Sequence, residues 1–224
     1  MDKFIASSVV TCKRFDSEKI TVNRGKLIEK ATENYRRFEF TEDGVSPRSR
    51  LGLDDGIFWN TGDESDETGH ITEDPVLRIK MMDKRMSRLD LILKEIPDDE
   101  KAISFGESEY TIISWGSSKG PIIDAIKKLK DEGISIGFIQ IKLLHPFPTE
   151  YVKSLIKNSK YIIDIEANHS GQLGKLFKQN VLRDIDYSIL KYTGRSMTSS
   201  EVYDALKKII QNKANKREVL SHGA

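Results

Sequence analysis

Hydrophobic residues follow two spacings in the second half of the chain, and the two spacings alternate. Short apolar runs typical of buried strands occupy residues 110–115, 134–141, 161–166 and 187–191. Amphipathic stretches follow at residues 121–132, 149–158 and 170–184, and from Thr198, where Thr198 and Glu201 match a capping box. Because strands that alternate with helices pair in parallel, residues 99–212 are predicted to form an α/β domain with a mostly parallel sheet flanked by helices.

A longer amphipathic helix is predicted immediately before this domain, over residues 75–98. Its apolar positions fall at three- and four-residue spacing, at Ile79, Met82, Met86, Leu89 and Leu93. Basic side chains crowd the opposite face. Asp74 is expected to cap the helix, with Pro75 as its first residue, and Pro97 is expected to end it.

Residues 1–74 show little periodicity. The one candidate strand is residues 35–40, and turn residues follow at Asp43-Gly44 and Ser46-Pro47. So long a stretch without regular elements is uncommon in an independent domain, so we predict an extended segment that wraps over another surface. At the other end, residues 213–224 are polar and are predicted to be a frayed tail.

Charge and cysteine content exclude several classes of function. The 224 residues carry 36 basic and 35 acidic side chains, so no overall field favours a nucleic acid or a membrane as a partner. Cys12 is the only cysteine, which excludes an intrachain disulfide, a four-cysteine zinc site and an iron–sulfur cluster on this chain's own thiolates. No apolar run approaches the roughly 20 residues that span a bilayer. We therefore expect a cytoplasmic protein.

Two loops after predicted strands could receive an anion. Residues 116–120 open a helix, so the backbone around Ser117, Ser118 and Lys119 could bind a phosphate or a carboxylate, although the spacing is not that of a P-loop. Asn168, Gly171 and Gln172 lie at the carboxyl end of another strand, the edge where parallel sheets bind ligands. The alternative for the first loop is a tight glycine turn, and for the second it is a structural or interface role.

Other polar residues give no firm site. The acidic residues at 63–67 could be drawn with His70 as a Mg²⁺ or Ca²⁺ site, but they lack the EF-hand register, which favours a solvated loop. His145 lies among apolar residues and is interpreted as structural, and Cys12 has no CxxC partner. From its chemistry alone the sequence indicates no catalytic residue, no metal site and no named reaction.

The order of four longer sequence segments is more informative than the individual polar residues. FTEDGVSPR at 40–48, GDESDETGHITEDP at 62–75, RIKMMDKR at 78–85 and EANHSGQL at 166–173 closely resemble the alpha subunit of 2-oxoacid:ferredoxin oxidoreductases. The resemblance covers nearly the whole chain in order. Within that family, residues 99–212 look like the transketolase C-terminal-like domain. Residues 1–74 look like the tail of the pyrimidine-binding domain plus a linker.

This resemblance implies a complex that oxidises a 2-oxoacid to an acyl-CoA. 2-Oxoglutarate is the expected substrate, ahead of pyruvate or a broader range. Thiamine diphosphate, Mg²⁺ and an iron–sulfur cluster would act in the complex, coenzyme A would be the co-substrate, and ferredoxin would accept electrons. The partners would be a thiamine-diphosphate-binding beta subunit and the N-terminal part of the alpha subunit. No cofactor is expected on this chain alone.

This sequence departs from the family pattern in two respects, which limits the residue roles that the resemblance implies for it. Ser65 stands where the family pattern has histidine, and the family's substrate-carboxylate motifs do not occur in this sequence. We therefore expect one piece of an alpha subunit, inactive by itself. If coenzyme A reaches it, Lys119 and Arg195 would supply charge, and Asn168 and Gln172 would supply hydrogen bonds. The alternatives are a stand-alone anion- or nucleotide-binding α/β module and a structural remnant without a ligand.

Overall fold

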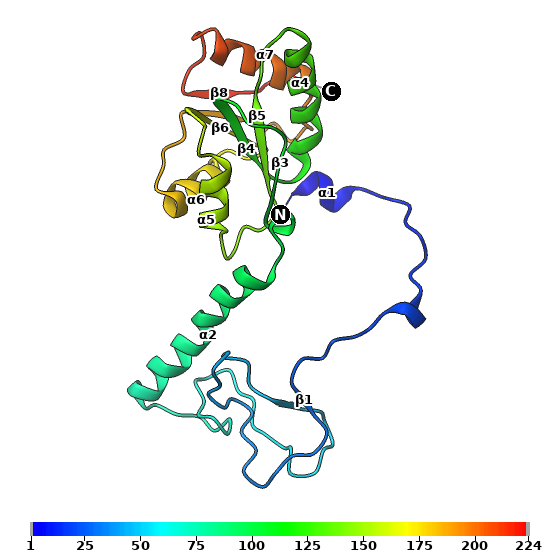
Figure 1. Ribbon diagram of the computed structural model, residues 1–224, viewed down its shortest axis with the longest axis vertical. Helices are drawn as coiled ribbons and strands as arrows, with labels where there is room; N and C mark the ends of the chain where they lie inside the picture. Colours follow the sequence, from blue (N-terminus) through cyan, green and yellow to red (C-terminus); the bar gives the residue numbers. More distant parts are fainter. Residues whose placement is uncertain (1, 223–224) are drawn as a thin grey trace. The chain divides into compact units, whose positions relative to one another are not determined.

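The computed structural model describes residues 2–222, which divide into two units (Figure 1). The α/β unit comprises the chain up to Val10 and from Ile96 onward. The linker unit comprises Thr11–Glu95, so the long amphipathic helix belongs with the segment before it.

A six-stranded sheet forms the centre of the described α/β unit, in the order β3-β5-β4-β6-β7-β8. The strands are β3 (Ala102–Ser104), β4 (Tyr110–Ser114), β5 (Gly137–Ile141), β6 (Tyr161–Glu166), β7 (Tyr187–Leu190) and β8 (Arg217–Val219). All neighbours pair in parallel except β3, which is antiparallel to β5. The mostly parallel sheet predicted from the sequence is therefore confirmed.

Helices cover both faces of this sheet (Figure 1). Helices α4 (Lys119–Asp131) and α7 (Ser199–Ile210) bury one apolar cluster, and α5 (Thr149–Leu155) and α6 (Gln172–Val181) bury another. Three short elements complete the unit: α1 (Lys3–Ser7), α3 (Asp98–Lys101) and the 3₁₀ turn η2 (Gly116–Ser118). Central strands covered on both faces explain the continuous apolar runs in the sequence.

The ends of the elements follow local chemistry. At α7, Thr198 accepts from the Glu201 amide, and the Glu201 carboxylate accepts in return from the Thr198 amide, which confirms the capping box. The predicted frayed tail needs correction, because Arg217–Val219 pair with β7 as an edge strand and Leu220 is 8% exposed. A three-residue edge strand has no periodicity of its own to reveal it.

The linker unit holds few regular elements: η1 (Ser17–Lys19), α2 (Pro75–Glu95) and the two-residue strands β1 (Leu27–Ile28) and β2 (Arg48–Ser49). Asp74 accepts from the Val76 amide at 2.8 Å, so the predicted start of α2 is confirmed. The strand predicted at 35–40 is wrong. The Phe38 and Phe40 amides donate to the backbone and side chain of Glu67 instead of to a neighbouring strand.

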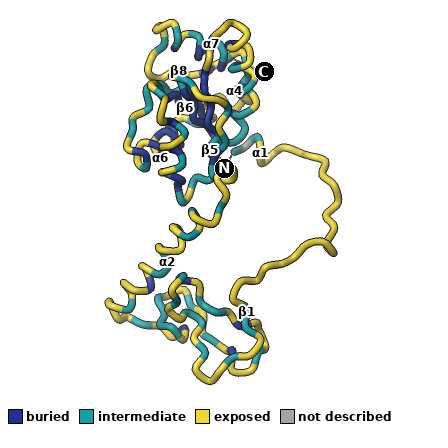
Figure 2. Tube along the Cα trace, in the orientation of Figure 1, coloured by how far each residue is buried: buried dark blue, intermediate teal, exposed yellow. Residues whose placement is uncertain are grey.

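Burial differs sharply between the two units (Figure 2). In the α/β unit the central strands β4, β5 and β6 are mostly buried, and Phe138 of β5 and Phe177 of α6 are the largest fully buried side chains. Among the buried hydrophobic residues of residues 2–222, only Met81, at 3% exposed, belongs to the linker unit. Residues 11–24 of that unit are exposed throughout. Within residues 2–222 no helix combines the length and apolar character needed to cross a membrane.

Candidate functional site

The two loops singled out from the sequence meet in the structure. β4 and β6 are neighbours in the sheet, whereas the crossover after β4 leads through α4 to β5 on the other side. The carboxyl ends of β4 and β6 therefore form a topological switch point, where open α/β sheets bind ligands. A pocket of about 110 Å³ lies there, with Asp2, Phe4, Trp115, Ser118, Ala167, Asn168 and Gln172 in its lining.

Glu166, the last residue of β6, is hydrogen-bonded to two residues of the pocket lining, Trp115 and Asn168. Its Oε1 accepts from the Leu173 and Gly174 amides at 2.8 and 3.2 Å, and its Oε2 accepts from Trp115 Nε1 and Asn168 Nδ2 at 3.1 and 2.7 Å. The carboxylate is fully buried and lies at the start of α6, where an anion is favourable. Sequence reasoning did not assign Glu166 any role beyond the resemblance.

Asn168 shapes the loop after β6. Its Oδ1 accepts from the Ser170 and Gly171 amides at 3.1 and 2.9 Å, while its Nδ2 donates to Glu166. Gly171 has φ +60°, which favours glycine, and precedes the first turn of α6. The polar atoms of Asn168 thus hold the loop, whereas the side chain of Gln172 is exposed at the pocket.

The other loop already holds a carboxylate. Asp2 accepts from the Ser117 amide and from Ser117 Oγ, both at 2.8 Å, and also from the Phe4 and Ile5 amides at 3.0 Å. A Cβ at Gly116 would overlap this carboxylate, so glycine is needed there. Burial acts to raise the pKa of Asp2, but the hydrogen bonds, led by that of Ser117, bring it below the ordinary value. No motif or periodicity in the sequence pointed to Asp2.

The two cationic candidates lie outside this pocket lining. Lys119 begins α4, and its Nζ lies 5.3 Å from the ring centroid of Phe105. Arg195 is exposed, and its backbone amide donates to Thr193 Oγ1. Of the six predicted residues, the structure therefore gathers Ser118, Asn168 and Gln172 in one lining and places Ser117 beside it.

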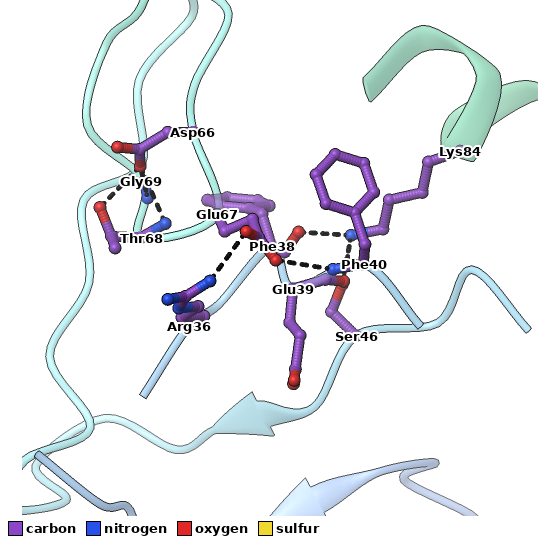
Figure 3. Close-up of polar contacts among 10 residues, drawn as sticks. All are labelled: Arg36, Phe38, Glu39, Phe40, Ser46, Asp66, Glu67, Thr68, Gly69 and Lys84. Atoms are coloured by element: carbon purple, nitrogen blue, oxygen red, sulfur yellow. Dashed lines mark hydrogen bonds and ion pairs between the residues drawn. The ribbon is translucent and has the colours of Figure 1, made fainter. Parts of the chain in front are cut away.

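In the linker unit, the three segments that carry the resemblance bind to one another (Figure 3). Lys84 of α2 donates to the carbonyls of Phe38 and Glu39 and to Ser46 Oγ, each at 2.6 Å. Burial, and then the nearby Arg88, lowers the pKa of Lys84 to about 8. The second segment joins the first through Glu67, which accepts from the Phe40 amide at 3.1 Å.

Glu64 joins the second segment to α2. It accepts two hydrogen bonds from Arg85 at 2.7 and 3.0 Å and one from Arg78 at 2.7 Å. Arg85 is the main reason that the pKa of Glu64 falls to about 2. Within residues 2–222 no group of three or more His, Cys, Asp or Glu side chains is placed to hold a metal ion.

Replacing Glu64 by glutamine is expected to loosen this unit. Because both arginines are partly solvated, the loss should be about 1 kcal/mol, seen as roughly fivefold faster amide hydrogen exchange at Asp66 and Thr72 at pH 7. The folded-state pKa is depressed, so the contribution is present above pH 4.5 and disappears as the pH falls toward about 2. Glu42→Gln, an exposed control, should leave exchange unchanged. Equal exchange in both variants would contradict this role.

Comparison with known proteins identifies relatives over the whole chain. Residues 108–208 match the family model described as pyruvate:ferredoxin oxidoreductase core domain II. Across 228 residues the chain is 42% identical to 2-oxoacid:ferredoxin oxidoreductase 2, subunit alpha, of Aeropyrum pernix, covering 100% of this chain and 35% of that protein. It is 39% identical over 229 residues to the corresponding alpha subunit of Saccharolobus solfataricus, covering 36% of that protein.

Among solved structures, a similar fold occurs in 2-oxoglutarate:ferredoxin oxidoreductase from Magnetococcus marinus, determined with 2-oxoglutarate, coenzyme A and succinyl-CoA bound. The TM-score is 0.77 at 27% identity, and the match covers 88% of this chain and 34% of that one. The chain thus spans about a third of the length of these three relatives.

Proposed function

Because this chain belongs to the alpha-subunit family of 2-oxoacid:ferredoxin oxidoreductases, we propose that it works as one module of an enzyme that oxidises a 2-oxoacid to an acyl-CoA. The observation that carries the proposal is the 42% identity over the whole chain to an alpha subunit of this family. 2-Oxoglutarate is the proposed substrate, supported by the similarity in fold to the Magnetococcus marinus enzyme. We place this assembly in the cytoplasm.

The cofactors are proposed to lie on partner subunits. Thiamine diphosphate with Mg²⁺ would supply the chemistry of decarboxylation, and an iron–sulfur cluster would carry electrons to ferredoxin. The residues present do not fit the two metal groups: the described part of this chain has no group of three or more His, Cys, Asp or Glu side chains placed for a metal ion, and Cys12, its single cysteine, is exposed. No step on this chain is therefore assigned to them. The proposed partners are a beta subunit and the remainder of the alpha subunit.

This chain's own contribution is proposed to be assembly and one wall of the coenzyme A side of the cleft. The pocket at the ends of β4 and β6 supports this, because the Ser117 amide and hydroxyl already receive a carboxylate, that of Asp2. A phosphate of coenzyme A could take the same two donors if Asp2 moved away. Gln172 is exposed in the lining of the same pocket and would add a side-chain amide.

Reconstitution tests the proposal. The chain is mixed with a beta subunit and the remaining part of an alpha subunit from the same organism, and viologen reduction is followed with 2-oxoglutarate, pyruvate and coenzyme A. Activity only in the complete mixture is the expected result, and the preferred oxoacid identifies the substrate. If no mixture is active with any oxoacid although the pieces assemble, the proposal is wrong.

The coenzyme A contact gives a narrower prediction. Combining Ser117→Ala with Gln172→Ala should raise the KM for coenzyme A about tenfold in the reconstituted enzyme and leave the KM for the oxoacid unchanged, because only the hydroxyl and the side-chain amide proposed to contact coenzyme A are lost. Asn168 is kept, since its loss would disturb the loop. The control is Ser154→Ala with Gln179→Ala, two side chains on other surfaces. An unchanged KM for coenzyme A removes this pocket from the coenzyme A site.

The carboxylate held by Ser117 also favours a second candidate, an anion-binding module that acts without the complex. Calorimetric titration of the full chain with coenzyme A, ADP and thiamine diphosphate separates the two. Tight binding by the chain alone supports the independent module. The absence of a binding signal in calorimetry, combined with activity on reconstitution, supports the first proposal.

A further inference from the structure

Helix α2 exposes the apolar stripe that its sequence predicts. The stripe, which we name the α2 stripe, consists of Ile79, Met82, Met86, Leu89 and Leu93. The first three are 61%, 38% and 54% exposed, and the two leucines are half-buried (Figure 2). Within residues 2–222, none of the five belongs to either apolar cluster. Because an amphipathic helix normally buries such a stripe, its exposure marks an interaction surface.

The loops of the linker unit pack against a different side of α2. Met81 is buried there, Lys84 donates to the carbonyls of residues 38 and 39, and Arg85 binds Glu64. At 3.6 residues per turn, the centre of the α2 stripe lies about 120° around the helix from Met81 and about 180° from Lys84. The contacts that hold α2 in its own unit therefore leave the stripe exposed.

The spacing along the stripe is that of a coiled coil. Its positions advance by three, four, three and four residues. Ile79, Met86 and Leu93 therefore take the a positions of a heptad, and Met82 and Leu89 take the d positions between them. In such a seam, each a or d side chain inserts between four side chains of a facing helix. The α2 stripe is therefore suited to another helix.

The charges beside the stripe select which helix. Asp83 and Asp90 take e positions, whereas Arg78 and Arg85 take g positions. In a parallel pair of identical helices, each g residue faces the e residue five positions further along the other helix. Arg78 then faces Asp83 of the second copy, and Arg85 faces its Asp90. In an antiparallel pair, e faces e and g faces g, which brings like charges together. Charge complementarity thus favours a parallel second copy of this chain.

All four charged side chains can take part. Within residues 2–222, Asp83 and Asp90 are exposed and neither makes an ion pair. Arg78 and Arg85 bind Glu64, but their side chains are 54% and 39% exposed. Arg78 gives Glu64 one hydrogen bond and Arg85 gives it two, and a guanidinium carries five N–H donors. Each arginine therefore keeps donors for a second carboxylate.

We propose that α2 pairs with α2 of a second copy as a short parallel coiled coil, so that the chain forms a homodimer through the α2 stripe. Two heptads make a small interface, so the association is weak. It is helped because α2 is already helical in the linker unit, which removes the cost of forming the helix. The pairing is independent of the proposed enzymatic function, because it uses no residue of the pocket at the ends of β4 and β6.

Sedimentation velocity of the full chain tests the pairing. At low ionic strength and pH 7, we expect the average mass to rise from one chain toward two as the concentration increases from about 5 to about 500 µM, the range of a weak interface. Combining Ile79→Lys with Met86→Lys should move this rise at least about tenfold higher in concentration, because lysines would meet in the seam.

The control combines Leu51→Lys with Ile57→Lys, two exposed apolar residues of the same unit that lie outside α2. It adds the same charge and should move the rise less than about twofold. A monomer at every concentration, or equal weakening by the two double variants, overturns the proposal. It is also overturned if the chain stays monomeric but needs Ile79 and Met86 to bind the remainder of the alpha subunit, which would then be the occupant.

Charge reversal tests the parallel orientation. Combining Asp83→Lys with Asp90→Lys sets lysines opposite the two g arginines and should weaken dimerisation at least about fivefold. Glu33→Lys with Glu42→Lys changes the charge equally at exposed positions outside α2 and should weaken it less than about twofold. Equal effects of the two variants would exclude the pairs between g and e positions and overturn the parallel dimer.

The register is tested by cross-linking. In a chain that carries Cys12→Ser, Ile79→Cys should give a disulfide-linked dimer on air oxidation, because equivalent a positions of a parallel pair lie within disulfide reach. Lys80→Cys, on the side of α2 away from the stripe, should not. Equal cross-linking at both positions, or none at position 79, contradicts the pairing.

Discussion

Replacing Glu166 by alanine is expected to lower the free energy of unfolding of the α/β unit by about 3–5 kcal/mol, the range for removing one partner from a buried charged network. Four donors lose their acceptor: the Leu173 and Gly174 amides, the Trp115 indole and the Asn168 side chain. The start of α6 also loses its anion. Urea unfolding followed by far-ultraviolet circular dichroism measures the change.

The matched control is Glu150→Ala on α5, which removes a carboxylate that is 85% exposed and paired with Lys153. That change should stay within about 0.5 kcal/mol, since exposed ion pairs contribute little. A loss at Glu166 no larger than at Glu150 would show that water replaces the missing acceptor. It would also weaken the case for the candidate pocket as a binding site, because the shape of that pocket depends on the loop that Glu166 and Asn168 hold.

Replacing Lys191 by methionine is the second change with a large expected effect, again about 3–5 kcal/mol. The Lys191 side chain is 1% exposed, and its Nζ donates to Glu201 Oε2 and to the His222 carbonyl, both at 2.6 Å. Methionine fills the space but leaves the Glu201 carboxylate, 8% exposed, without its cation. Urea unfolding at pH 7 is the measurement, and the exposed Lys157→Met is its control.

The pH dependence of this pair has a definite sign. Burial acts to raise the pKa of Glu201, but hydrogen bonds from Lys191 and Thr198 hold it below its ordinary value of 4.5. The pair's stabilisation is therefore complete above pH 4.5 and is lost as the pH falls through the folded-state pKa. Lys191→Met should show a weaker loss of stability in acid than the unaltered chain. Equal acid sensitivity in both would mean that Glu201 gains its stabilisation from the helix cap alone.

Glu166 and Glu201 are surrounded by donors from the chain itself, so their removal should affect stability first. Asp164 is a different case: burial, and then the neighbouring Glu166 carboxylate, raises its pKa to about 9, so at neutral pH the protonated acid is a donor toward Glu166. Stability measurements also serve as a control for the coenzyme A experiment, because a raised KM in a variant of unchanged stability is not explained by unfolding.

Much of the fold followed from local pattern. Residues 161–166 read as a strand and are β6, and Asp74 and Thr198 start the helices that their caps predict. The pairing of the two candidate loops could be expected only in part, because both follow strands but nothing local says that β4 and β6 are neighbours. The strand predicted at 35–40 failed because its amides bind Glu67, a residue 27 positions from Phe40.

Periodicity, helix caps and motif order were enough to indicate the α/β class and the family, because each depends on residues close together in sequence. Strand order and register decided the rest. They set Glu166 among four donors, aligned Asp164 with Ser188 and Arg217, and buried Lys191 against Glu201. Whether a buried charged group is satisfied depends on partners that only the folded chain brings within hydrogen-bond distance.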